Sequence, residues 1–404
     1  MSPTDYDSII RFMLKLAEAL HRFGAPAYML EDLANTIGRR LGIECQFASM
    51  PTQVIASFGH LESQRTYLVR VVPGELDLNK QILLGDVAED VMNSRTDPRK
   101  GESRVEEIIN APSLYSDGLA MLCYGAASGV AARFFGGGWR EIITSLVSGL
   151  LVGVLAAVTS RTHQAVRVFE ASAAVIVTAL AIIGAVVLGP MSTTISIMGG
   201  IVVLLPGFTV TVAMGELASR HLISGTVRLM GAMTVLLVIV MGVTFGELAA
   251  SYFFGINRGW LPIGLPWWTE IIAVVIGMFA YTILLRAPFR ESPYILIAGV
   301  VTYFAITIGN MFYGPDIAAG IAALVLGIYG NLYSRLRRKQ ASITIAPAIL
   351  YLVPGSMGLK SVFSIMEKNV FSGIETAFQM GMMALFIVTG LLVANLILPS
   401  RKIL

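Results

Sequence analysis

The sequence predicts a polytopic α-helical membrane protein of about ten transmembrane helices, arranged as two inverted five-helix repeats, with a small N-terminal α/β cytoplasmic domain. Of its 404 residues, 55% are hydrophobic and 14% are charged, whereas soluble domains carry roughly 25% charged residues. Apolar runs of about 20 residues, the length that crosses a bilayer, recur from residue 114 onward. Two of these runs are interrupted by a Pro-Gly pair, Pro206-Gly207 and Pro354-Gly355.

Residues 1–113 predict a soluble α/β domain. Apolar residues at helical spacing predict helices over 6–23 and from Pro26 to Leu41, and alternation predicts strands at 43–47, 52–58 and 65–72. Asp77 and Asp97-Pro98 are typical helix starts. This part has 12 basic and 16 acidic residues, a net charge of −4 (12 − 16), so a nucleic-acid partner is not expected.

No catalytic or metal-binding pattern stands out in the sequence. His21, Glu31, Ser57 and His60 are scattered, and no nucleophile elbow, phosphate loop or spaced Cys/His set accompanies them. We therefore expect no catalytic residue, no metal and no cofactor. A membrane-anchored enzyme or regulatory protein that acts through the N-terminal domain is the alternative of another class.

The membrane part divides into two predicted five-helix repeats, 114–258 and 259–404. The ten predicted spans lie near 114–134, 141–160, 168–189, 193–218, 227–254, 269–286, 293–311, 316–334, 342–364 and 374–398. With the N-terminus inside, the short inner loops and the tail hold 12 basic residues and the outer loops hold 5. This asymmetry predicts a protein of the plasma (inner) membrane with both termini in the cytoplasm.

The second Pro-Gly pair follows the first by 148 residues (354 − 206), and Ser224-Gly225 recurs as Ser372-Gly373 at the same interval. This interval carries the first five spans onto the last five. Because five is odd, the second copy enters the membrane in the opposite sense, as in many secondary transporters. Chance is the alternative, since Pro-Gly pairs are common in membrane helices.

The two breaks are the predicted substrate site. A half-helix that starts inside the membrane presents free N–H groups and a partial positive charge, which suit a carboxylate, while freed carbonyl groups suit an ammonium group. A packing kink, with the hydroxyls bonded to their own helix, is the alternative. The predicted substrate-binding residues are Pro206, Gly207, Thr209, Thr211, Pro354, Gly355 and Ser356.

Three acidic residues near the spans are candidates for proton coupling. An acidic side chain inside the membrane is energetically unfavourable, so it is a functional candidate by default. The three residues are Glu247 in the fifth span, Glu216 near the end of the fourth and Asp316 at the start of the eighth. Glu216 and Asp316 are equally consistent with solvated helix ends. Asn395 lies in the tenth span.

Several short motifs carry a family resemblance. The segment Leu20-His21-Arg22-Phe23-Gly24-Ala25-Pro26 with Glu31, then Leu41-Gly42 and Met50-Pro51-Thr52, resembles the soluble start of the bacterial threonine/serine exporters. The doubled Pro-Gly spans resemble their membrane part, so the resemblance covers nearly the whole chain. It implies ten spans, a cytoplasmic N-terminal domain and proton-driven export of threonine and serine.

Some members of that family are tied to dicarboxylate export, so small dicarboxylates such as succinate are the alternative substrates. The expected partners are a small-molecule substrate and the lipid bilayer, and a homo-oligomer is left open. The soluble domain is expected to gate or regulate transport by docking its first amphipathic helix on the cytoplasmic mouth.

Overall fold

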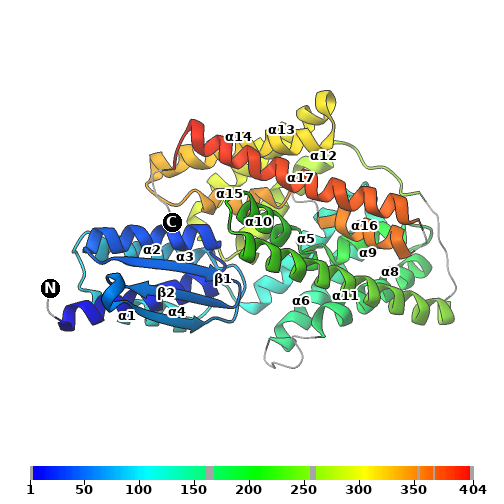
Figure 1. Ribbon diagram of the computed structural model, residues 1–404. Helices are drawn as coiled ribbons and strands as arrows, with labels where there is room; N and C mark the ends of the chain where they lie inside the picture. Colours follow the sequence, from blue (N-terminus) through cyan, green and yellow to red (C-terminus); the bar gives the residue numbers. More distant parts are fainter. Residues whose placement is uncertain (1–2, 161–167, 255–260, 353–354, 367–368, 401–404) are drawn as a thin grey trace.

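The structure is a computed structural model that describes residues 3–160, 168–254, 261–352, 355–366 and 369–400. Pro354 and six basic residues used for the predicted orientation lie outside the described residues; the six are Arg161, Arg167, Arg258, Lys368, Arg401 and Lys402. The described chain is mostly helical, with one three-stranded sheet near its start (Figure 1).

Residues 3–110 form one unit, at the left of Figure 1, which we call the N-terminal unit. Its elements are α1 (Pro3–Arg22), α2 (Ala27–Leu41), β1 (Cys45–Met50), β2 (Gln53–Phe58), η1 (Leu61–Ser63), β3 (Arg65–Arg70), α3 (Leu78–Met92) and α4 (Pro98–Asn110). The sheet is antiparallel in the order β1-β2-β3, with Phe47 opposite Ala56 and Ala56 opposite Tyr67. The predicted helices are present, and three strands lie near the predicted ones, the first at Cys45–Met50 rather than at 43–47.

Local chemistry explains where these elements begin and end. Gly42 ends α2 in the left-handed region at φ 70°, which glycine adopts without steric cost. The Asp77 side chain accepts a hydrogen bond from the Lys80 N–H at 2.9 Å, and Asp97 accepts one from Arg99. Both aspartates satisfy N–H groups that the first helical turn leaves free. The apolar faces of the helices and of β2 then pack around Phe12, which is fully buried.

In its described residues, the apolar part of the chain consists of helices and the connections between them. Its elements are α5 (Asp117–Phe134), α6 (Trp139–Thr159), α8 (Phe169–Val187), α9 (Thr193–Gly200), η2 (Val202–Leu204), α10 (Gly207–Ala218), α11 (Leu222–Phe254), α12 (Trp268–Leu284), η3 (Phe289–Glu291), α13 (Ser292–Tyr313), α14 (Pro315–Arg337), α15 (Ser342–Ile349), α16 (Gly355–Met366) and α17 (Val370–Ile397). Each of the ten predicted spans coincides with one helix or one interrupted pair.

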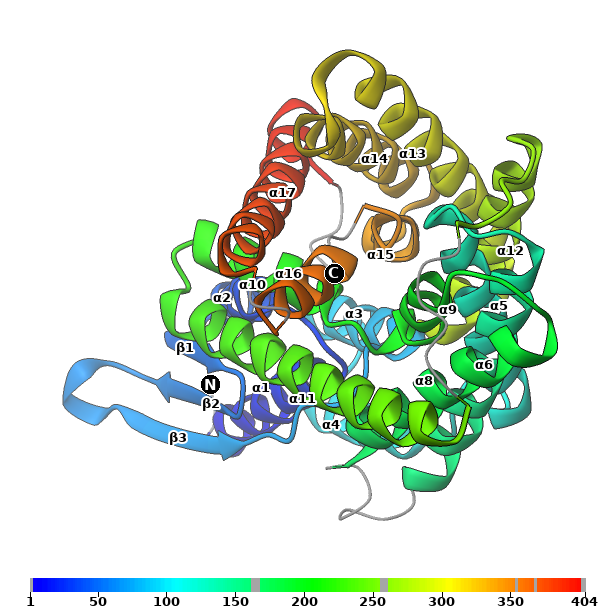
Figure 2. The same ribbon diagram turned by 90° about the vertical axis from the view of Figure 1, so that its right-hand side faces the viewer.

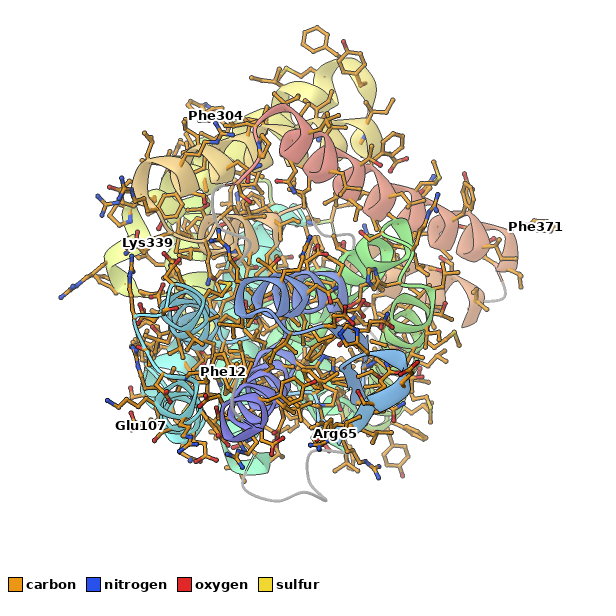
Figure 3. All side chains as sticks on the ribbon, turned by 60° about the vertical axis from the view of Figure 1, so that its left-hand side comes forward. Phe12, Arg65, Glu107, Phe304, Lys339 and Phe371 are labelled. Carbon is orange, nitrogen blue, oxygen red and sulfur yellow. The ribbon has the colours of Figure 1, made fainter. Side chains whose placement is uncertain are left out.

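By length and hydropathy, six helices in the described residues can cross a membrane, or seven if the bent pair α9–α10 is one span. The protein is thus a polytopic helical membrane protein, while the number ten stays a prediction. Large apolar side chains cover its outer surface. Phe304 and Phe371, which are 48% and 91% exposed, project outward in Figure 3, whereas Phe12 lies inside the N-terminal unit. Such a surface suits lipid rather than water.

The interrupted helices lie at the centre of the helical part. In Figure 2, α9, α10, α15 and α16 are surrounded by the longer helices, among them α11, α17 and α14. The packing of the two halves is matched. α8 packs on α11 as α14 packs on α17, and α10 packs on α11 as α16 packs on α17. Across the halves, α10 also packs on α17 and α16 on α11.

Candidate functional site

The first Pro-Gly pair breaks its helix as predicted. α9 and the segment that follows it, Val202–Ala218, are bent by 49°. Leu205 is extended at ψ 126°, since the residue before a proline avoids the helical region. Pro206 precedes the first residue of α10, Gly207, where its missing N–H interrupts no helical hydrogen bond. The discontinuity in the fourth predicted span is therefore confirmed.

The second interruption meets the first. α15 ends at Ile349 and α16 begins at Gly355. A Cβ placed on Gly355 would lie 3.2 Å from the Cβ of Leu205 and 3.4 Å from the Cα of Gly207. Glycine is needed at Gly355 for this approach of two backbones. The N-terminal ends of α10 and α16 thus touch, and they leave no space for a ligand between Gly207 and Gly355.

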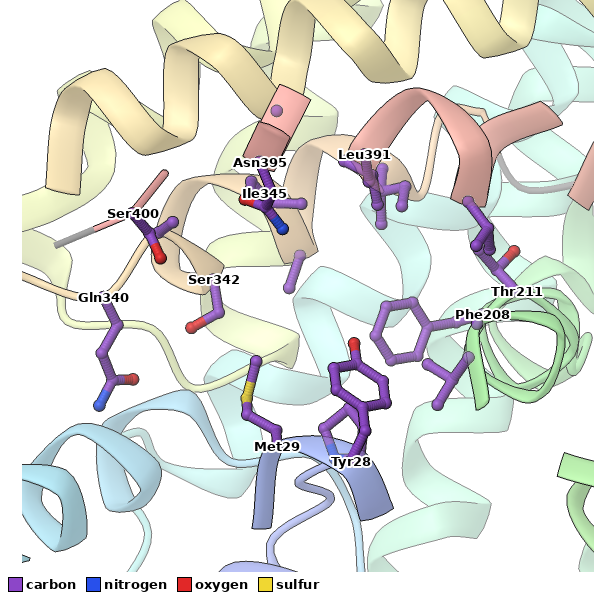
Figure 4. A pocket seen from close by; sticks show the side chains of 18 of the residues that line it. Tyr28, Met29, Phe208, Thr211, Gln340, Ser342, Ile345, Leu391, Asn395 and Ser400 are labelled. Carbon is purple, nitrogen blue, oxygen red and sulfur yellow. The ribbon is translucent and has the colours of Figure 1, made fainter. Parts of the chain in front are cut away.

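A cavity of about 240 Å³ lies beside the two interruptions. That volume is just below the roughly 300–1,000 Å³ of pockets for drug-sized ligands, so it suits a small metabolite. Its walls come from α10, α14, α15, α17 and the N-terminal unit (Figure 4). Residues that line it include Tyr28, Met29, Phe208, Thr211, Gln340, Ser342, Ile345, Leu391, Asn395 and Ser400.

The cavity wall is mainly apolar, with several uncharged polar side chains among its described lining residues. No acidic, basic or histidine side chain is among its described lining residues. The Asn331 side-chain N–H donates to Asn395 Oδ1 at 2.7 Å, and the Gln340 side-chain N–H donates to the Gln81 carbonyl at 3.4 Å. Asn331 Oδ1 and Gln340 Oε1 are buried and accept no hydrogen bond from the described part of the chain. Two lining residues therefore each carry a buried acceptor atom that lacks a donor among the described residues.

The N-terminal unit supplies one side of the cavity. Tyr28 and Met29 of α2 point into it (Figure 4). Burial raises the pKa of Tyr28, so its hydroxyl stays neutral and remains a hydrogen-bond donor. The first amphipathic helix, α1, does not line this cavity; it packs on α4 and α2. The expectation that α1 docks on the membrane part is wrong here, because the apolar face of α1 is used in the core of the unit.

The predicted substrate residues divide into three groups. Thr211 lines the cavity, and its hydroxyl donates to the Gly207 carbonyl at 3.2 Å, a bond within its own helix. Gly207 and Gly355 form the contact between the half-helices, and Pro206 directly precedes α10. Thr209 and Ser356 are half-buried and outside the described lining.

Glu216 is fully buried and is not a solvated helix end. Its carboxylate accepts two hydrogen bonds from the Arg228 guanidinium at 3.0 Å and one from the Ala27 N–H at 3.1 Å. The second of these partners is the first residue of α2, so the carboxylate sits at the positive end of that helix. Glu216 thereby ties the N-terminal unit to the membrane helices.

Further bonds join the N-terminal unit to both halves. Glu31 and His221 approach to 3.1 Å, and the Ser224 hydroxyl donates to the Ser49 carbonyl at 2.6 Å. On the other side, the N–H groups of Leu78 and Asn79 donate to the carbonyls of Leu285 and Arg286 at 3.1 and 3.2 Å. The unit therefore contacts the connection after α10 and the connection after α12.

The other two coupling candidates lie away from the cavity wall. Glu247 is half-buried within α11 and interacts with a neighbour. Asp316 lies in the first turn of α14, and its Oδ1 is buried without a partner among the described residues. Neither is among the described lining residues. In the described chain, no three His, Cys, Asp or Glu side chains are placed to hold a metal ion.

Sequence reasoning missed most of the cavity wall. Asn331, Gln340, Ser342 and Tyr28 were not predicted, although Asn395 was noted as a polar residue in the tenth span. One available signal was Asn331, an amide inside an apolar helix, because polar groups at that depth must find a partner or a ligand. Tyr28 gave no such signal, since its role depends on how the N-terminal unit packs.

Comparisons with known proteins give a family match along most of the chain. A threonine/serine exporter family model matches residues 11–248, and a second, "Threonine/Serine exporter, ThrE", matches residues 270–397. The chain is 28% identical over 392 residues to "Pheromone-regulated membrane protein 10" of Debaryomyces hansenii, covering 91% of this chain and 37% of that protein.

Proteins of the same name from other yeasts match similarly. The identity is 29% over 395 residues in Candida albicans and 28% over 379 residues in Saccharomyces cerevisiae, each covering 91% of this chain. These matches cover 34% and 48% of the two relatives, so the chain spans between a third and a half of the length of these curated relatives. No solved structure matches the chain.

Proposed function

This chain belongs to the threonine/serine exporter family, and from that premise we propose that it exports small hydroxy amino acids, threonine and serine, from the cytoplasm. It is an exporter-type membrane transporter, and the substrate occupies the cavity beside the two interrupted helices. Thr211 contributes from the first half, and Asn331, Gln340, Ser342 and Asn395 contribute from the second.

The observation that carries this proposal is the cavity wall, whose described residues include several polar side chains and no charged one. A buried charge without a partner is strongly unfavourable. A dicarboxylate brings two negative charges, and the described wall has no basic side chain to neutralise them. A zwitterionic amino acid has no net charge, and its ammonium and carboxylate groups can each take neutral hydrogen-bond partners. Threonine and serine are therefore favoured over succinate.

The matched packing of the two halves supports an inverted repeat and a route through the centre. Each half places an interrupted helix against its own fifth helix and against the fifth helix of the other half. Such half-helices at a repeat interface are the usual binding position in secondary transporters. We place the N-terminal unit and both termini in the cytoplasm and the chain in the plasma membrane, so the cavity faces the cytoplasmic side.

Proton coupling completes the proposal, with Glu216, Glu247 and Asp316 as its candidate residues. An acid within the membrane part that changes protonation can link transport to a pH gradient. Glu216 is the best supported of the three, because its partners Arg228 and Ala27 lie on two different elements of the transporter. Its loss of charge would weaken the contact between α10 and α2.

The test is transport by the purified full-length chain in proteoliposomes. Vesicles are loaded with labelled threonine, serine or succinate, and efflux is followed with and without an imposed pH gradient. We expect efflux of threonine and serine that is accelerated by the gradient. Efflux of succinate alone would refute the proposed substrate, and equal amino-acid efflux in both gradient conditions would refute coupling. Protein-free vesicles are the control.

A further inference from the structure

In the first half, a protein carboxylate occupies the start of a central half-helix. Glu141 is 2% exposed. Its Oε1 accepts a hydrogen bond from the N–H of Ser192, which immediately precedes α9, at 2.7 Å. Its Oε2 accepts one from the Gly138 N–H at 2.9 Å. Backbone N–H groups at helix starts and the helix dipole both favour an anion at such a place.

The corresponding half-helix of the second half, α15, begins at the cavity without a carboxylate. α9 and α15 each have eight residues. Ala341, which precedes α15, gives no side-chain cap, and the N–H groups of Ala341 and Ser342 have no acceptor in the described part of the chain. Both residues line the cavity. Glu291 is the acidic residue that directly precedes α13. Its carboxylate does not cap α15 but bonds to Tyr333 and Lys339.

Two unpartnered acceptors lie on the same wall. Asn331 is 1% exposed and Gln340 is 4% exposed. Their side-chain N–H groups are engaged by Asn395 and Gln81, which leaves Asn331 Oδ1 and Gln340 Oε1 without a donor among the described residues. A buried amide oxygen without a donor is unfavourable and rare in folded proteins. These oxygens accept only, so they suit a cationic donor.

We propose that this wall binds the two charged groups of an α-amino acid separately. The ammonium group donates to Asn331 Oδ1 and Gln340 Oε1, and the carboxylate accepts from the free N–H groups at the start of α15. The inference rests on the proposed function and adds the orientation of the substrate and the groups that select it. The carboxylate of Glu141, a residue of α6, fills at the start of α9 the position that the substrate carboxylate takes at the start of α15.

The amide subsite is tested by threonine transport and by competition in proteoliposomes with two analogues. Threonine methyl ester keeps the ammonium group without the carboxylate, and 3-hydroxybutyrate keeps the carboxylate and the side-chain hydroxyl with hydrogen in place of the ammonium group. Asn331→Leu and Gln340→Met remove an acceptor at similar size, and each is expected to raise the KM for threonine about tenfold, the scale of a hydrogen bond to a charged group. Inhibition by 3-hydroxybutyrate is expected to stay unchanged in both variants.

The matched control is Ser334→Ala. Ser334 is on α14, three residues after Asn331, and its hydroxyl is also buried without a partner among the described residues, but it is outside the described cavity lining. Its removal is expected to leave the KM for threonine within twofold. Should Asn331→Leu fail to fold, Gln340→Met and Asn331→Asp decide the question. The aspartate is expected to bind the methyl ester more tightly than the wild type does.

The start of α15 is tested with Ala341→Asp. This variant places a carboxylate at the start of α15, as the Glu141 side chain does at the start of α9. We expect the KM for threonine to rise about tenfold and inhibition by the methyl ester to strengthen. Unchanged threonine KM in Ala341→Asp and in both amide variants would overturn the inference and leave the proposed function standing. A wild type that moves no amino acid would instead refute the proposed function. A sodium requirement for threonine transport that Asn331→Leu abolishes would assign the amide oxygens to a metal cation and overturn the ammonium assignment.

Discussion

At the scale of single residues, Glu216 has the most tightly bonded carboxylate between the N-terminal unit and the membrane helices. It is fully buried and accepts three hydrogen bonds, two of them from Arg228, whose side chain is 21% exposed. A buried ion pair contributes little on balance, but removing one partner leaves the other charge poorly compensated. Neutralising Glu216 is therefore expected to lower the free energy of unfolding by more than the ion pair itself contributes to it.

The first prediction concerns Glu216→Gln. The amide can still accept from the Ala27 N–H, but it leaves the Arg228 charge unpaired, so we expect the free energy of unfolding to fall by up to about 3 kcal/mol. Thermal or denaturant unfolding in detergent measures this. Glu107→Gln is the control, because Glu107 is exposed on α4, and it should change stability by no more than about 0.5 kcal/mol. Equal effects in the two variants would show that Glu216 is not a structural link.

The second prediction concerns His21 and acid. Burial lowers the pKa of His21, and the Arg228 charge acts in the same direction, although the hydrogen bond to the Pro51 carbonyl opposes it. The folded protein therefore holds His21 neutral, while the unfolded chain takes up a proton below about pH 6.5. Because the unfolded state then binds more protons, stability falls as the pH decreases from about 6.5 toward the lower folded pKa.

In measurements of unfolding between pH 7.5 and 5, His21→Gln is expected to reduce the slope of stability against pH. His60→Gln is the matched control, since the His60 side chain is 81% exposed and lies on the same unit. A slope that His21→Gln leaves unaltered would mean that other groups carry the acid sensitivity.

At the scale of the elements, local sequence chemistry predicted most boundaries. Alternating residues predicted the three strands, Asp77 and Asp97 predicted helix starts, and Pro206 predicted the break that the structure has. All of these depend on interactions within a few residues. The contact of Gly355 with Gly207 joins residues 148 positions apart (355 − 207), and the cavity joins Tyr28 to Asn395, 367 positions apart (395 − 28). No short pattern records such distant pairings, so only the location of the breaks could be predicted.

The third prediction tests the contact between the two half-helices. In Gly355→Ala, the added Cβ would lie 3.2 Å from Leu205 Cβ and 3.4 Å from Gly207 Cα, atoms that cannot rotate away. We expect the ends of α10 and α16 to separate, with stability lowered by about 1–3 kcal/mol and threonine efflux reduced at least tenfold while membrane insertion is retained. Efflux from proteoliposomes and the unfolding temperature are the measurements.

Gly381→Ala is its control, because a Cβ on this glycine of α17 meets no atom within 4 Å. Alanine is also the better helix former by roughly 1 kcal/mol, so this variant should be at least as stable as the wild type and fully active. If Gly355→Ala exports threonine at the wild-type rate, the close approach of the two breaks is not needed for transport.

At the scale of the whole molecule, the N-terminal unit closes one side of the cavity and is bonded to both halves. Ser224 and His221 hold it on the first half, and Leu285 and Arg286 hold it on the second. Tyr28 and Met29 would have to move before a substrate could enter from that side. The unit is therefore expected to open and close as part of transport, with the strength of these bonds setting how often it opens.

The fourth prediction measures this opening through a cysteine at the cavity wall. In a protein carrying Met29→Cys, with Cys45 and Cys123 replaced by serine, reaction with a water-soluble maleimide reports the fraction of time that the wall is open. Adding His221→Ala and Ser224→Ala removes two hydrogen bonds to the unit, worth about 2 kcal/mol together, so labelling should accelerate at least about tenfold. Arg65→Ala is the control, because Arg65 forms an ion pair with Asp7 inside the unit, at an exposed position, and it should leave the labelling rate unchanged.

Threonine should slow labelling wherever it fills the cavity. If the double variant is labelled at the rate of its parent, the unit does not gate this wall, and the substrate must reach the cavity by a route that leaves α2 in place.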